Sequence, residues 1–136
     1  MKLKGHWQRG FRAACNASGK STGPQVGYRV GAALYASNNL ISNGYNVWGK
    51  TTPMTKHETY VGNLHAEMLA ISKRRHYDNS SNLTLYVWRS VTNSSKTKYE
   101  AGCSRPCPNC MKLIKFAGVR RVRFYDETGN PAEIKL

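Results

Sequence analysis

The chain has 136 residues, 40% of them hydrophobic, and this length and composition predict a single compact domain over residues 1–136 with a core of its own. No segment approaches the roughly 20 apolar residues that a membrane helix needs, and no apolar stretch after the basic first residues could serve as a secretory signal. We therefore expect a soluble, cytoplasmic protein with no membrane partner. Lys and Arg number 21 against 7 Asp and Glu, and the net charge of +14 is typical of proteins that bind polyanions, most commonly nucleic acid. The alternative is a basic protein whose charge serves no particular partner.

The first part of the chain predicts one helix and one hairpin. Four apolar residues near the start recur at helical spacing: Trp7, Phe11, Ala14 and Cys15. They predict a first helix that buries one stripe, with Cys15 as a core residue. Residues 28–36 and 40–47 predict two extended segments of a hairpin, in which glycines allow close backbone approach. The polar stretch at 49–63, rich in Gly and Thr, predicts a loop.

The rest of the chain predicts alternating helices and strands. Helices are predicted at 64–75 and 107–118, each from an apolar stripe at helical spacing. Strands are predicted at 82–91, 119–126 and 132–136, with a long polar loop at 92–102 and a short turn between the last two strands. This order predicts an α/β fold, a three-layer sandwich in which a mixed five-stranded sheet is flanked by helices.

A cluster of cysteines leads into the last predicted helix. Cys103, Cys107 and Cys110 form a C-x3-C-x2-C run, with Pro106 directly before the second cysteine. A chain of this size needs no disulfide staples, and a clustered run in a reducing compartment more often binds metal. Cys107 and Cys110 are three residues apart in a first helical turn, so their thiolates point the same way at a helix N-terminus, which favours negative charge.

His65 lies in the first turn of the second predicted helix and meets the two thiolates if the two helices pack side by side. One His and two Cys give Zn²⁺ three ligands and leave a fourth position for water, as in catalytic zinc sites. Glu67, in the same helical turn, can reach that water without binding the metal. Two alternatives stay open: Glu67 as an ordinary surface residue of a helix, and Cys103 as the fourth ligand of a closed Cys3His site in a non-catalytic zinc module.

These residues also form a sequence signature. His65 and Glu67 read H-x-E, and Pro106, Cys107 and Cys110 read P-C-x-x-C, the pattern of zinc nucleobase deaminases. On this motif, on the order of elements and on "GYN" at 44–46, the chain resembles the cytidine deaminase superfamily over most of residues 25–136. The resemblance implies a cytidine deaminase-like fold and hydrolytic deamination with zinc as the cofactor.

The resemblance further implies a role for each matched position. His65, Cys107 and Cys110 would be the zinc ligands, and Glu67 the catalytic residue that carries protons. Asn46, at the end of the second strand, would hold the sugar of the substrate. The backbone N–H of Ala66 would bind the carbonyl of the base, and the backbone carbonyl of Arg105 would bind its exocyclic amine.

The short connection between the last two predicted strands helps to indicate which base is the target. Parallel pairing of the last two strands needs a crossover of about a dozen residues or more, which "ETGNP" at 127–131 is too short to supply. The chain therefore resembles the C-terminal-hairpin branch of the superfamily, which includes free cytidine deaminases, bacterial toxin deaminases and plant RNA-editing domains, and where cytosine is the usual target. Deamination of adenosine in tRNA is then a minority interpretation. The loop before His65 also lacks the additional Cys and His set with which many deoxycytidylate deaminases bind a second zinc.

Charge and aromatic residues together favour a polynucleotide substrate. Single-strand binders combine a basic groove with rings on which bases stack, and Trp48, Trp88 and Tyr99 are expected to border the pocket, although Trp88 could instead be a core residue. We therefore expect deamination of cytosine to uracil in single-stranded DNA or RNA. The alternative is a free cytidine, deoxycytidine or dCMP deaminase. A homo-oligomer in which a neighbouring copy completes the site is compatible with the resemblance.

Overall fold

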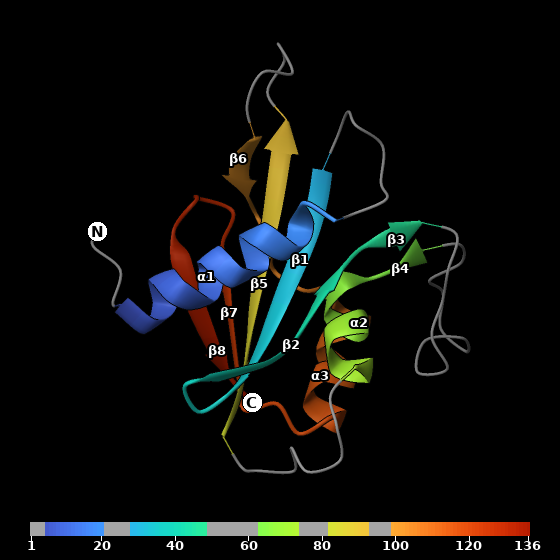
Figure 1. The fold of residues 1–136 in the computed structure, drawn as a ribbon, viewed down its shortest axis with the longest axis vertical. Coiled ribbons are helices and arrows are strands. Elements are labelled where there is room, and N and C mark those ends of the chain that lie inside the picture. The colour runs from blue at the N-terminus through green and yellow to red at the C-terminus, as the bar shows by residue number, and fades with distance from the viewer. Residues whose placement is uncertain (1–4, 21–27, 49–62, 74–81, 93–98) are drawn as a thin grey trace.

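The computed structural model describes residues 5–20, 28–48, 63–73, 82–92 and 99–136 (Figure 1). Among these residues, no helix has the length and apolar character needed to cross a membrane. The statements below concern this part of the chain.

One mixed sheet forms the centre of the fold. Its main path runs β2-β1-β5-β7-β8, with these bounds: β1 at Tyr28–Ala36, β2 at Asn39–Tyr45, β5 at Leu83–Thr92, β7 at Arg121–Tyr125 and β8 at Pro131–Lys135. Only the β5 and β7 pairing on this path is parallel, and the other pairings are antiparallel. The predicted mixed five-stranded sheet is therefore confirmed.

Three short strands were not predicted. The strand β6, Tyr99–Gly102, pairs antiparallel with the end of β5, so the prediction of a loop throughout 92–102 is wrong. The strands β3, Val47–Trp48, and β4, Asn63–Leu64, form a separate two-stranded sheet. Leu64 therefore lies in a strand, and the second helix begins two residues later than predicted. The predicted loop at 49–63 lies outside the described residues except for Asn63.

Helices cover both faces of the sheet, as the three-layer prediction requires (Figure 1). The helix α1, Gly5–Ser18, crosses one face, while α2, Ala66–Ser72, and α3, Pro108–Phe116, lie side by side on the other. Because side chains alternate along a strand, β5 contributes Tyr86 to the cluster under α1 and Leu85 to the cluster under α2 and α3. Each face thus has its own apolar core.

The helix α2 packs very closely on β2, because a glycine lies beneath it. A Cβ atom at Gly44 would collide with the carbonyl oxygen of Ala66, the first residue of α2, and with the backbone of Ala70. Next to this contact, the Ser42 hydroxyl donates a hydrogen bond to the Ala70 carbonyl over 2.6 Å. The predicted close approach in the hairpin is confirmed, and it fixes the position of the start of α2.

The last two strands form a tight hairpin. Asp126 Oδ1 accepts hydrogen bonds from the backbone N–H of Thr128 (2.9 Å), the Thr128 hydroxyl (2.6 Å) and the N–H of Asn130 (3.0 Å). Gly129 has a φ of 83°, in the left-handed region that favours glycine. The antiparallel pairing of β7 with β8 confirms the hairpin expected from the short connection.

Candidate metal centre and adjoining pocket

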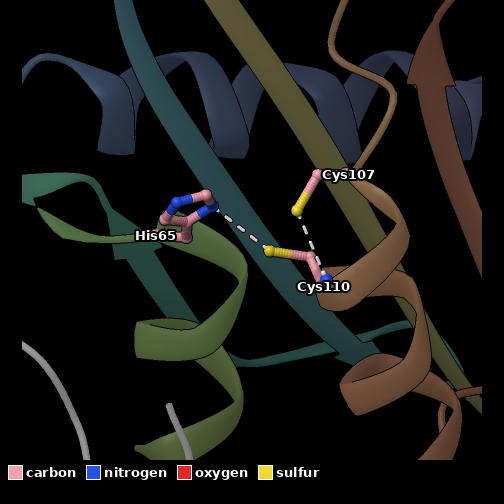
Figure 2. A group of neighbouring side chains, drawn as sticks. All are labelled: His65, Cys107 and Cys110. Carbon is pink, nitrogen blue, oxygen red and sulfur yellow. Dashed lines mark hydrogen bonds between the residues drawn. The ribbon is translucent and has the colours of Figure 1, made fainter. Parts of the chain in front are cut away.

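The N-termini of α2 and α3 bring three potential metal ligands together. His65 is the N-cap residue of α2, Cys107 is the N-cap residue of α3, and Cys110 follows in the first turn of α3. Their ligand atoms all lie within 4.8 Å of one another (Figure 2). The side-by-side packing of two helices from distant parts of the sequence therefore produces the cluster expected from the motif.

The chemistry and spacing of this group fit zinc. Zinc bonds of about 2.3 Å to sulfur and 2.0–2.1 Å to nitrogen place the ligands of a tetrahedral site about 3.6 Å apart, and Cys110 Sγ lies 3.2 Å from His65 Nδ1. The backbone N–H of Cys110 donates to Cys107 Sγ over 3.4 Å, which orients this sulfur at the start of α3 (Figure 2). Burial lowers the pKa of His65 and so favours its neutral form, which ligation requires.

Cys103 does not join this group. It lines the adjoining pocket, but its sulfur is not part of the set within 4.8 Å. The described geometry therefore brings together three ligands rather than the four of a closed Cys3His site, and it leaves one position of a tetrahedron for water or substrate.

A pocket of about 260 Å³ adjoins the three ligands. Four residues singled out from the sequence line it in addition to His65 and Cys107: Asn46, Ala66, Glu67 and Arg105. Glu67 lies in the first turn of α2 and is only 5% exposed. Burial raises the pKa of its carboxyl group, because the charged form loses solvation. A surface role for Glu67 is thereby excluded.

Asn46 presents an unpaired donor in this pocket. Its Oδ1 accepts from the backbone N–H of Val30 over 2.9 Å, and its own backbone N–H donates to the Val30 carbonyl over 3.2 Å. These bonds fix the orientation of the amide, and Nδ2 is buried without a hydrogen-bond partner among the described residues. An unsatisfied buried donor costs about 1–3 kcal/mol, and this donor belongs to a residue that lines the pocket.

Trp88 does not reach the pocket, and this prediction is wrong. Its ring contacts Tyr125 at 5.4 Å on the side of the sheet that α1 covers, and its Nε1–H donates to Ser90 Oγ over 2.7 Å. The alternation of β5 explains the placement, because Val87 and Arg89 line the pocket and Trp88 between them faces the other way. The backbones of Trp48 and Tyr99 lie in β3 and β6, and their side chains lie outside the described part of the structure.

Two polar residues of the pocket were missed in the sequence. Arg89 lines the pocket beside Val87, because these two residues are two positions apart in β5 and so lie on the same face. Strand alternation could therefore have identified Arg89. The Ser104 hydroxyl donates to the Val87 carbonyl and accepts from the Tyr125 N–H, both at 2.8 Å. Ser104 thus ties the segment before α3 to the neighbouring strands β5 and β7.

The Arg105 side chain turns outward to Glu127 at 3.3 Å, so a contact of Arg105 with substrate would use its backbone.

The comparisons with known proteins give one family and a set of structural neighbours. Residues 6–126 match the family described as the cytidine and deoxycytidylate deaminase zinc-binding region. The fold is similar to that of a cytidine deaminase from Burkholderia pseudomallei, with a TM-score of 0.60 and 18% identity over 98% of this chain and 93% of that one. A dCMP deaminase from the cyanophage S-TIM5 gives a TM-score of 0.55 and 24% identity, over 93% and 87% of the two chains. A cytidine deaminase from Mycobacterium leprae gives 0.56 and 21%, over 93% and 92%. No curated protein matches the sequence.

Proposed function

Because the chain belongs to the cytidine and deoxycytidylate deaminase zinc-binding family, we propose that it removes the amino group of cytosine in a free nucleoside or nucleotide by hydrolysis. The observation that carries this proposal is the meeting of a His–Cys–Cys ligand set with a buried carboxylate, Glu67, at one small pocket. The products are the corresponding uracil compound and ammonia.

Each group at the pocket has a part in this reaction. His65, Cys107 and Cys110 would hold zinc, which would supply a Lewis acid that lowers the pKa of bound water to about 7. Glu67 accepts a proton from the attacking water and delivers it to the ring nitrogen of the base. Glu67 then carries the second proton of that water to the amine, which leaves as ammonia. The water oxygen becomes the carbonyl oxygen at the carbon that bore the amine.

Three further groups are placed to hold the substrate. The Nδ2 of Asn46 donates to a sugar oxygen, which gives this buried donor a partner. The N–H of Ala66 belongs to the first turn of α2 and has no partner within its own helix, so it is available to the carbonyl of the base. The backbone carbonyl of Arg105 accepts from the exocyclic amine and orients it as the leaving group. Asn46, Ala66 and Arg105 all line the pocket.

The size of the pocket and the structural neighbours support a free substrate. A volume of about 260 Å³ lies just below the range of about 300–1,000 Å³ for small-molecule pockets. The neighbours with known structures include cytidine deaminases and a dCMP deaminase solved with dCMP and dUMP. The C-terminal hairpin supports the branch of the superfamily that contains free cytidine deaminases. Arg89 adds a cation to the lining of the pocket, where a nucleotide would bring its phosphate.

Cytosine in single-stranded nucleic acid is a second candidate substrate. One observation favours it, the net charge of +14, because a basic surface attracts the phosphate backbone. None of the comparisons adds to this observation.

A comparison of three substrates tests the proposal. The zinc-loaded protein is incubated with deoxycytidine, dCMP and a single-stranded oligonucleotide that contains cytosine, and the uracil product is quantified. We expect kcat/KM for deoxycytidine or dCMP to exceed that for the oligonucleotide at least tenfold. Turnover of the oligonucleotide alone would establish the second candidate instead, and no turnover of any cytosine substrate would contradict both.

A further inference from the structure

A second cavity lies on the other face of the sheet, away from the ligand cluster. It has a volume of about 210 Å³, and its lining comes from α1, β1, β5 and β7. The residues that matter most for its chemistry are Arg9, Tyr35, Asn82, Tyr86, Arg121 and Arg123. Tyr35 and Tyr86 belong to the cluster under α1, so the central sheet separates this cavity from the pocket that contains Glu67.

The cavity concentrates positive charge. Arg9 of α1 and Arg121 and Arg123 of β7 contribute three guanidinium groups, and no carboxylate is part of the lining among the described residues. Glu133 on β8 pairs with Arg123 at 2.7 Å. Within the described residues, neither Arg9 nor Arg121 forms an ion pair. Three positive charges therefore line one cavity, and among the described residues only the charge of Arg123 is paired.

Two of the three arginines, Arg121 and Arg123, are held in place by their neighbours. The Arg123 side chain is only 11% exposed, donates from Nε to Glu133 and from Nη1 to the Tyr86 hydroxyl, and stacks over the Trp7 ring at 4.6 Å. Arg121 Nη1 donates to Asn82 Oδ1 over 2.8 Å. A guanidinium group has five N–H donors, so these bonds leave Arg121 and Arg123 with further donors for a ligand. A fixed guanidinium loses less conformational entropy when it binds.

We propose that this cavity binds the phosphate group of a small phosphorylated molecule. Arginine forks match the spacing of phosphate oxygens and bind them with paired, charge-assisted hydrogen bonds. Arg9 from the helix and Arg121 and Arg123 from the strand line the same cavity and are the groups that would contact the phosphate. The cavity is large enough to hold more than the phosphate itself, and the Tyr35 side chain offers a ring and a hydroxyl to the remainder of the molecule.

Titration calorimetry of the zinc-loaded full chain tests this site at constant ionic strength. The two probes are inorganic phosphate and ribose 5-phosphate, neither of which contains a base that the protein could deaminate. We expect saturable binding of one phosphate group per chain at this cavity. Arg9→Gln and Arg121→Gln should each weaken it at least tenfold, while preserving the circular dichroism spectrum. If ribose 5-phosphate binds more tightly than inorganic phosphate, the ligand is an organic phosphate. If the two affinities are equal, the site recognises the phosphate group alone. Both results support the site.

Matched control variants show whether the binding depends on the cavity itself. Arg12→Gln and Arg120→Gln remove exposed arginines of the same regions that do not line the cavity, and they should leave the affinity unchanged. Arg123 is left intact, because its contacts with Glu133 and Tyr86 hold β7 and β8. Arg89→Gln tests whether phosphate occupies the pocket beside Glu67. The proposal is overturned if no saturable binding occurs, or if the two cavity variants bind phosphate with the same affinity as the two control variants. It is also overturned if only Arg89→Gln abolishes binding.

Discussion

Asn46 is the residue whose contacts separate a structural role from a substrate role. Its Oδ1 serves Val30, whereas its Nδ2 has no partner among the described residues. Asn46→Asp keeps an acceptor for the Val30 N–H, removes the free donor and adds an ionisable group. We therefore expect a stable fold with kcat/KM for the nucleoside reduced about tenfold or more, since one hydrogen bond is lost and a charge is introduced into the pocket. Steady-state kinetics together with a thermal melt measure both effects. Unchanged kcat/KM would show that Nδ2 does not contact substrate.

Substitutions of Cys107 and Cys103 should have different effects on zinc binding. Cys107→Ser should lose zinc, because it removes one of the three candidate ligands that the described residues bring together. Cys103→Ser should retain the full zinc content and deamination within about threefold, because Cys103 lies outside the ligand group. Zinc content per chain, measured by atomic emission, distinguishes the two variants. Loss of zinc from Cys103→Ser would instead favour the closed Cys3His site.

The site residues differ in how well the sequence alone predicts them. His65, Glu67, Cys107 and Cys110 could be predicted because their residue types and spacings follow directly from metal chemistry and helix geometry. Trp88 and Arg89 could be assigned to faces only once the inward face of β5 was known, because an aromatic residue next to a basic one fits either face of a strand. The face is decided by the neighbouring Val87, which packs in the core beneath α2 and α3.

At the scale of elements, the close packing of α2 on β2 determines where His65 and Glu67 lie. Gly44→Ala places a methyl group against the backbone of Ala66 and Ala70, which cannot move aside as a flexible side chain would. We expect the free energy of unfolding to fall by about 1–3 kcal/mol, the usual cost of overpacking, and zinc affinity to fall with it. Urea denaturation and a competitive zinc titration measure these effects.

Gly5→Ala is the matched control for this variant. A Cβ atom at Gly5, in the first turn of α1, meets no other atom within 4 Å. Its zinc affinity should therefore equal that of the parent protein, and its stability should not fall, because Ala favours a helix more than Gly does. Equal behaviour of Gly44→Ala and Gly5→Ala would show that the close packing of α2 is not required.

The turn between β7 and β8 should depend on pH through Asp126. Hydrogen bonds from Thr128 and Asn130 lower the pKa of this carboxyl group below its ordinary value. A lowered folded-state pKa means that the stabilisation is fully present above the ordinary value of about 3.9 and is lost as the pH falls through the lower folded-state value. The melting-temperature difference between the parent and Asp126→Asn should therefore be present at neutral pH and shrink in strong acid. A constant difference over that whole range would contradict this assignment.

Long elements were predictable from periodicity, and short ones were not. The helix α1 and the strands β1 and β5 each contain enough alternating or helical pattern to be recognised. The strands β3, β4 and β6 have two to four residues each and exist because a partner strand lies beside them. Their pairing is a tertiary contact, so no local signal marks it.

At the scale of the whole molecule, the sheet separates two concave sites with different chemistry. The face under α2 and α3 bears the ligand cluster and the buried carboxylate, and the face under α1 bears the arginine cavity. A net charge of +14 does not reveal this division, because a sum over the chain contains no information on which face a cation occupies. The net charge therefore favoured a polynucleotide when the sequence was considered alone, whereas the proposed function takes a free nucleoside or nucleotide.

The central claim is that Glu67 moves protons beside a zinc ion that it does not bind. Glu67→Gln preserves the size of the side chain and removes its ability to accept a proton. The decisive measurement is kcat/KM for the preferred cytosine substrate, with zinc content determined on the same samples. The account predicts a loss of at least about 100-fold, the lower end of general acid–base catalysis, with zinc retained at one ion per chain. Activity within tenfold of the parent, at full zinc content, would contradict it.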